Sequence, residues 1–181
     1  PDELEREIEK RFGDKKEAVK AAVAEAYPDR PLCEVLTVDT SVRSEVLRMA
    51  NLLAKRGDTP LYVYLFSWVT PLHNGHAMCF RNSEMPFVFN NPEKAVYSRV
   101  GGLEAKRLAK IMSRCWTSFA RSGNPNNSIT PYWRRVNHDQ GYTMIFDRDV
   151  HLKTSSDLNL MRIMHPEVVK DIKDYSTLLL P

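Results

Sequence analysis

The chain has 181 residues, of which 43% are hydrophobic and 27% are charged, and its formal net charge is +3. This composition is too apolar for a disordered chain and too charged for a membrane bundle. The longest apolar run, over residues 61–66, is far shorter than the roughly 20 residues that cross a bilayer, so the sequence excludes a membrane span. Basic residues are interspersed with acids, and we therefore expect no nucleic-acid partner.

The first part of the chain predicts three helices. Apolar residues recur every three or four positions over 3–12 and 15–26, and the first of these segments is followed by Gly13. A third helix is predicted after the N-capping sequence 39–41 (Asp-Thr-Ser), and Gly57 is expected to end it.

A continuous apolar segment at 61–68 (LYVYLFSW) predicts a strand that is buried on both faces, as in a mostly parallel sheet. Such a strand needs partners on both edges. The chain offers two further short strands and three further helices: strands at 142–146 and 150–153, and helices at 103–120, 157–164 and 167–175. We therefore predict an α/β fold, with a mostly parallel sheet covered by helices, whose missing strands lie in sequence outside this chain.

Residues 69–102 form a long connection, rich in proline and glycine, directly after the predicted buried strand. Long structured loops at this place in α/β proteins usually carry functional groups. Cysteines 33, 79 and 115 have no metal-ligand spacing. Cys115 is expected in the core, while a disulfide from Cys33 to either of the other two is left open.

Four strings occur in a fixed order: 61–71, 75–91, 112–126, and 132–133 continuing to 142–147. In sequence, order and spacing they resemble the carboxyl-terminal part of the type-B carboxylesterase family, relatives of the cholinesterases. The resemblance implies an α/β-hydrolase fold and hydrolysis of small-molecule carboxylic esters by a Ser-His-Glu/Asp triad, with no metal and no cofactor. In that chemistry the histidine takes the serine proton and later returns it to the leaving alcohol.

The chain contains no Gly-x-Ser-x-Gly elbow. The nearest string, 120–123 (ARSG), is expected at a helix end with Ser122 on the surface. By family order, the serine, the acid and the oxyanion donors precede Pro1. We therefore interpret residues 1–181 as the carboxyl-terminal portion of one catalytic domain, whose partner is the amino-terminal part of that domain.

The resemblance places the family's catalytic histidine seven residues before Val88, and this position is Arg81. Arginine has no acceptor nitrogen and stays protonated, so it cannot act as a general base. Three explanations are open: a laboratory inactivation or an error in the sequence, a natural inactive member used for binding, or an enzyme rescued by another histidine. His76, in the same loop, is the rescue candidate.

By the same resemblance, Glu84 is expected to support this loop, and some of the residues Ala77, Met78, Cys79 and Phe80 are expected to border an acyl or alcohol pocket, with Met78, Cys79 and Phe80 as the candidates. The other reading makes Glu84 a local salt bridge or cap and residues 77–80 plain packing residues. The remaining histidines need no functional role. The sequence thus predicts a portion of a carboxylic-ester hydrolase that is inactive alone, with a catalytically silent, cholinesterase-like binding module as the alternative. It does not indicate an oligomeric state or a compartment.

Overall fold

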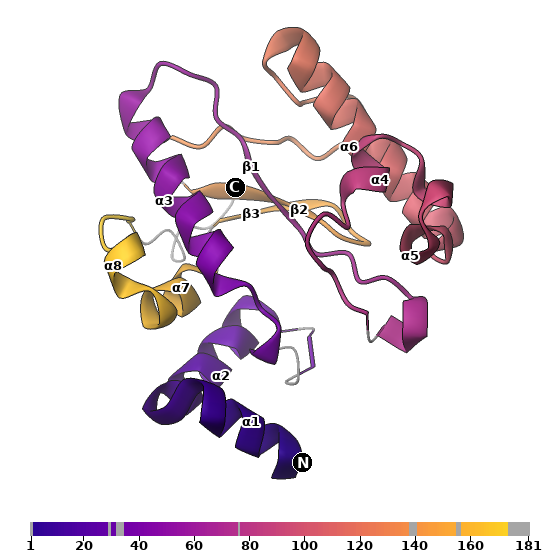
Figure 1. The fold of residues 1–181 in the computed structure, drawn as a ribbon. Helices are drawn as coiled ribbons and strands as arrows, with labels where there is room; N and C mark the ends of the chain where they lie inside the picture. Colours follow the sequence, from indigo (N-terminus) through magenta and orange to yellow (C-terminus); the bar gives the residue numbers. More distant parts are fainter. Residues whose placement is uncertain are drawn as a thin grey trace. The chain divides into compact units, whose positions relative to one another are not determined.

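The structure is a computed structural model (Figure 1). It describes residues 2–28, 30–31, 35–75, 77–137, 141–154 and 157–173. The chain divides into two compact units: one is Pro1–Thr59 with Asn137–Gly141 and Thr154–Pro181, and the other is Pro60–Val136 with Tyr142–Lys153.

The first unit is helical. Its helices are α1 (Asp2–Phe12), α2 (Lys16–Ala26), α3 (Thr40–Arg56), α7 (Leu158–Met164) and α8 (Pro166–Val169), with a 3-10 turn η1 (Gly13–Lys15) between the first two. Their apolar faces meet in one cluster that includes Ile8, Val19, Leu47, Leu160 and Val169, all of them buried. The three helices predicted in the first sixty residues are therefore confirmed.

The ends of α3 follow from local chemistry. The Asp39 carboxylate accepts a hydrogen bond from the Val42 amide at 2.9 Å, as expected of an N-cap. Gly57 ends the helix at a φ of 70°, a left-handed conformation that glycine adopts without steric cost. By contrast, α8 stops at Val169, although the predicted helix ran over 167–175; its last two residues, 174 and 175, lie outside the described part of the chain. The Asp171 and Ile172 carbonyls accept hydrogen bonds from the Asn51 and Arg162 side chains, which hold the chain in a non-helical course.

The second unit contains a sheet in the order β1-β2-β3, formed by β1 (Val63–Phe66), β2 (Tyr142–Phe146) and β3 (His151–Thr154). The first two strands are parallel, with Val63 opposite Thr143. The predicted parallel pairing and both short strands are thus present.

Burial within the sheet differs from the prediction. In β1 only Val63 is buried, and Tyr64 is 37% exposed. It is β2 that is buried at every position except Ile145. The reason is position: in the described part of the chain β2 lies between two strands, whereas β1 is at the edge of the sheet.

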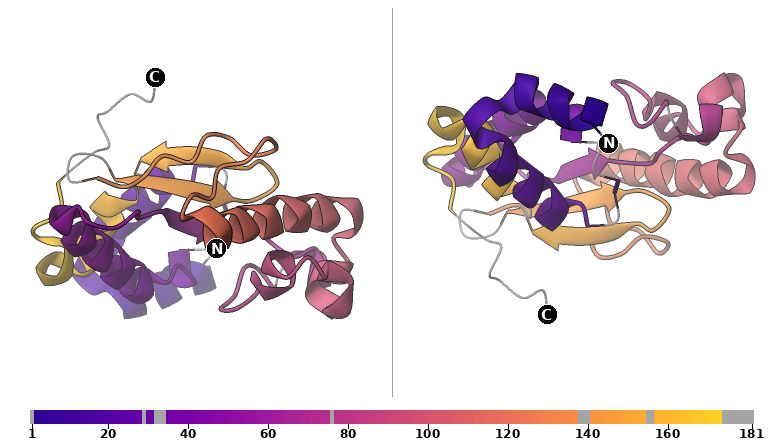
Figure 2. Two further views of the ribbon diagram at one scale, coloured as in Figure 1. Left: turned by 90° about the horizontal axis from the view of Figure 1, so that it is seen from above. Right: turned by 90° about the horizontal axis from the view of Figure 1, so that it is seen from below.

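Helix α6 (Gly102–Ser122) is the longest element of the second unit and ends at Gly123, which has a φ of 70°. Its buried face includes Ala105, Leu108 and Met112, which join Trp68 and Phe146 in the core of this unit. Both views of Figure 2 show α6 running alongside the sheet with α4 and α5 next to it. Among the described residues, no helix combines the length and the apolar composition that a membrane span requires.

The connection at 69–102, expected as one long loop, contains four short turns, one of which has left-handed backbone angles at His73 and Asn74. These are η3 (Leu72–Gly75), α4 (Met85–Val88), η4 (Pro92–Lys94) and α5 (Val96–Arg99). Each is three or four residues long, too short to give an apolar periodicity that a sequence pattern would detect.

Candidate active-site loop

The loop after β1 returns to the carboxyl end of that strand. The Thr70 amide donates a hydrogen bond to the Met78 carbonyl at 3.5 Å, and the Cys79 thiol donates to the Phe66 carbonyl at 3.3 Å. Phe66 is the last residue of β1. Residues 78–80 therefore lie at the carboxyl edge of the sheet, which is where α/β proteins bind their ligands.

Arg81 follows in a tight turn over 81–84 that leads directly into α4. Its side chain is exposed. The backbone on either side is unusual, because Met78 and Asn82 have φ values of 52° and 66°. Positive φ is uncommon for residues other than glycine, and such residues concentrate at functional sites. The turn thus holds Arg81 on the surface at the sheet's carboxyl edge.

Glu84 begins α4 with its backbone. Its carbonyl accepts hydrogen bonds from the Phe87 amide at 2.9 Å and the Val88 amide at 3.0 Å. Its carboxylate is half-buried. Burial, and after it the negative charge of Glu84, raises the pKa of the Tyr64 and Tyr97 hydroxyls. The Glu84 carboxylate is therefore near the hydroxyls of two tyrosines, one from β1 and one from α5.

The residues before Arg81 differ in exposure. Met78 and Cys79 are half-buried, while Phe80 is 43% exposed. The Phe80 ring meets Tyr97 edge to face, with ring centroids 4.8 Å apart. The Thr70 hydroxyl donates to the Tyr97 carbonyl. Helix α5 therefore fixes Phe80 from one side through Tyr97.

A second support, which the sequence did not predict, centres on Trp68. The Trp68 indole N–H donates to the Glu104 carboxylate at 2.5 Å, and Glu104 also lies 3.4 Å from Arg148 Nε. The Trp68 ring packs on Phe87 of α4 with centroids 5.0 Å apart. A Cβ at Gly101 would lie 2.6 Å from the Trp68 ring, so glycine is required there for close packing. This chain of contacts links α6 to α4 and hence to the turn of Arg81.

Several predicted residues lie away from this loop. Ser122 is exposed and donates to the Ser118 carbonyl at 2.9 Å, as expected at a helix end. Cys115 is fully buried, and burial raises the pKa of its thiol to about 11. His76 and Cys33, on which the rescue and the disulfide depend, lie outside the described residues.

No group of three potential metal ligands occurs among the residues that the structure describes. A surface hollow of about 400 Å³ lies on α3 and not at the Arg81 turn; it is lined by Ser41, Val42, Glu45, Val46 and Met49.

Comparison with known proteins identifies the family. Residues 2–163 match the Carboxylesterase family, and the chain belongs to it. Among curated relatives, an acylcarnitine hydrolase of Rattus norvegicus is 32% identical over 98 residues, covering 50% of this chain and 17% of the relative. A phenmedipham hydrolase of Pseudarthrobacter oxydans is 27% identical over 149 residues, covering 80% and 30%.

Among solved structures, an esterase from Clostridium hathewayi superposes with a TM-score of 0.77 at 30% identity, over 88% of this chain and 31% of that one. The carboxylesterase EST55 of Geobacillus stearothermophilus superposes with a TM-score of 0.65 at 24% identity, over 87% and 33%. The predicted α/β-hydrolase fold is thereby confirmed. The chain spans a third or less of the length of these four proteins.

Proposed function

We propose that this chain is the carboxyl-terminal portion of a serine carboxylesterase domain and contributes the loop that carries the family's catalytic histidine. In this assignment Arg81 occupies the position of that histidine. Glu84 supports the loop, and Met78, Cys79 and Phe80 border the substrate. The partners are a small-molecule carboxylic ester and the amino-terminal part of the same domain, which supplies the serine and the acid.

The observation that carries the proposal is the position of the Arg81 turn within a family match that covers most of the chain. The Cys79 contact with Phe66 brings this turn to the carboxyl end of a parallel strand. A histidine in the same turn would be positioned by the backbone of residues 78–84, with Glu84 at the end of the turn. General bases need such fixed placement.

With arginine at position 81, the proton transfers of ester hydrolysis lack their base. A guanidinium donates hydrogen bonds and keeps its charge, so it holds a carboxylate in place but accepts no proton from a serine. We therefore expect no esterase activity from this chain, and little from the full-length protein with Arg81 in place.

The test is turnover of p-nitrophenyl acetate by the full-length protein with Arg81→His. A positioned general base contributes about 10²–10⁴-fold in rate, and we expect a gain of that order. Arg81→Gln is the matched control, because it removes the charge without supplying an imidazole, and it should give no gain. A rate unchanged by Arg81→His would remove the assignment of this position.

The second candidate is a catalytically silent binding module of the same fold, and the arginine itself favours it. The sequence that the gene encodes before residue 1 distinguishes the esterase from the binding module. A Gly-x-Ser-x-Gly elbow there supports the esterase. Absence of the elbow, in a protein that also has Arg81 at the histidine position, supports the binding module.

A further inference from the structure

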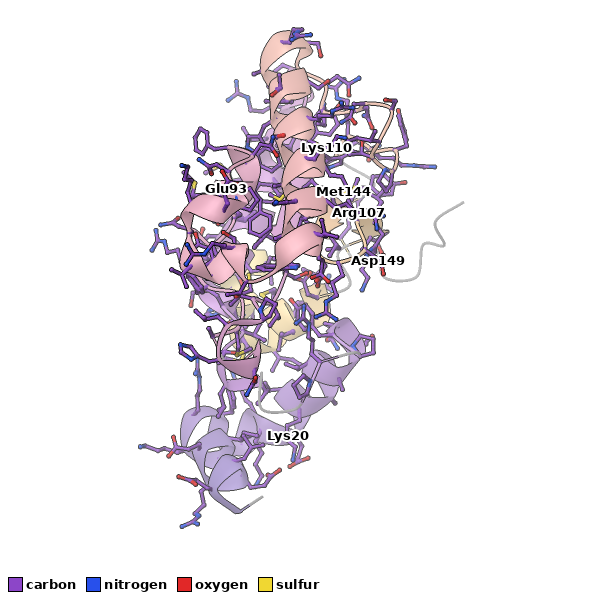
Figure 3. The ribbon with its side chains drawn as sticks, turned by 90° about the vertical axis from the view of Figure 1, so that its right-hand side faces the viewer. Lys20, Glu93, Arg107, Lys110, Met144 and Asp149 are labelled. Carbon is purple, nitrogen blue, oxygen red and sulfur yellow. The ribbon has the colours of Figure 1, made fainter. Side chains whose placement is uncertain are left out.

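Five cationic side chains lie on one face of α6. Lys106, Arg107, Lys110, Arg114 and Arg121 are all exposed, and Figure 3 labels two of them, Arg107 and Lys110, on the face of the molecule toward the viewer. At 3.6 residues per turn, the five fall within an arc of about 100° and extend along about 22 Å of the helix. We call this set the α6 basic ridge.

The ridge differs from the other charged helix surfaces of this protein. On α1, α2 and α3, several cations pair with acids, as in Lys20 with Glu5 and Arg48 with Glu45. Residues 105–122 contain five cations and no acid, so the interspersion of basic and acidic residues expected from the sequence does not extend to this helix. In the part of the chain that the structure describes, no ion pair or hydrogen bond involves a ridge side chain.

Local stability does not account for the ridge. Lys106, Lys110 and Arg114 follow one another at intervals of four residues, where like charges repel and destabilise a helix. Only Arg121, in the last turn, has a favourable interaction with the carboxyl end of the helix. A negatively charged partner would relieve this repulsion.

Shape and polarity indicate what that partner is. The opposite face of α6, with Leu108, Met112 and Cys115, is buried in the core, so the ridge faces away from the core of this unit. A helix face is convex, which suits a plane of headgroups better than an extended peptide. Leu103 lies on the same face and is 84% exposed, an apolar side chain placed where a lipid surface would take it up.

We propose that the α6 basic ridge docks the protein onto a membrane surface that contains anionic phospholipids. Lys and Arg side chains bind the phosphate and carboxylate groups of such headgroups. Their combined electrostatic attraction decays over about one Debye length from the membrane surface. The mode is peripheral: the ridge rests on the headgroups, and Leu103 enters the boundary of the acyl region. This inference is independent of the proposed esterase function, because it uses no residue of the Arg81 loop.

The test is flotation of the purified full-length protein with phosphatidylcholine vesicles, with and without phosphatidylserine. We expect binding only when phosphatidylserine is present, and release as salt is raised. Lys110→Gln with Arg114→Gln should weaken binding at least about tenfold. Lys10→Gln with Lys55→Gln is the matched control: it removes two exposed cations from other helices and should bind like the wild type. Circular dichroism would verify that both variants are folded.

An equal loss in both double variants would show that net charge and not the ridge is responsible, and would overturn the proposal. Absence of binding to phosphatidylserine vesicles would also overturn it. Retention on poly-glutamate or duplex DNA without vesicle binding would assign the ridge to another class of partner. Leu103→Ser distinguishes docking from simple counter-ion attraction, because only docking predicts that it weakens vesicle binding.

Discussion

At the scale of single residues, a buried ion pair in the first unit governs how stability depends on pH. Arg43 Nε lies 2.6 Å from Asp157 Oδ2, and Arg43 Nη2 lies 3.0 Å from Oδ1. The two residues are 7% and 3% exposed. Burial alone would raise the pKa of Asp157, but the Arg43 charge and hydrogen bonds, including one from the Tyr27 hydroxyl, hold this pKa below its ordinary value.

Replacing Asp157 by Asn should lower the free energy of unfolding by about 3–5 kcal/mol, because the Arg43 charge would remain buried without its carboxylate. The folded-state pKa lies below the unfolded value of about 3.9, so the pair's contribution is complete above that pH and is lost as pH falls through the folded pKa. The free energy of unfolding of the wild type, measured with urea, should therefore decrease progressively below about pH 4. The Asp157→Asn variant should lack the part of this decrease that comes from the ion pair.

Asp58→Asn is the control for this prediction. Asp58 also pairs with an arginine, Arg56, but both side chains are more than half exposed. Its loss should change stability by no more than about 1 kcal/mol. Stability curves of wild type and Asp157→Asn that run parallel down to pH 2 would contradict the role given to the pair.

The sequence located single residues only where a family pattern or a local rule applied. Asp39 and Gly57 were predicted as helix ends because capping depends on residues a few positions apart. Arg43 and Asp157 are 114 residues apart, and no periodicity indicates that they meet. The same holds for Trp68 and Glu104. The apolar run at 61–68 identified the strand, but the hydrogen-bond partner of the Trp68 indole depends on tertiary packing.

At the scale of elements, α6 is expected to control the order of the Arg81 turn through Trp68. Glu104→Ala removes the acceptor of the indole N–H, and Trp68 packs on Phe87 in the helix that follows the turn. A hydrogen bond of this kind contributes about 0.5–1.5 kcal/mol. Local opening of the turn should therefore become up to about tenfold more frequent. Limited trypsin digestion, which cleaves after Arg81, would report it as faster cleavage at that bond.

Glu104→Gln separates the hydrogen bond from the charge. Both variants lose the interaction with Arg148 and the negative charge in the first turn of α6, but glutamine keeps an acceptor for Trp68. We expect cleavage at Arg81 to be near wild type in Glu104→Gln and faster in Glu104→Ala. Equal rates in the two variants would show that Trp68 does not transmit order to the turn.

Elements were predictable from the sequence in proportion to their length. Helices α3 and α6 span several turns, so their apolar faces repeat often enough to be recognised. The turns α4 and α5 were missed because one turn has no repeat. The predicted burial of β1 was too high. An apolar sequence indicates that a strand is suited to a buried position, but it does not show whether neighbouring elements in this chain cover the strand.

At the scale of the whole molecule, an exposed apolar face on α3 bears on the proposal that this chain is part of a larger domain. Val42, Val46 and Met49 lie four and three residues apart on one side of the helix and are 55%, 41% and 50% exposed. They line the hollow on α3. Contiguous apolar surface of this kind usually marks a contact with another surface. If the rest of the domain covers it in the full-length protein, the 181-residue chain alone should associate with itself.

Val46→Glu should therefore weaken self-association of the 181-residue chain. Covering a valine contributes about 1.5–3 kcal/mol, so the dissociation constant from sedimentation equilibrium should rise about tenfold or more. Ile129→Glu is the matched control, because Ile129 is 37% exposed outside this face and the change adds the same charge. In the full-length protein the same Val46→Glu change should lower stability instead, since it would place a charge in a covered contact. A wild-type chain that stays monomeric at high concentration would indicate that the α3 face needs no cover.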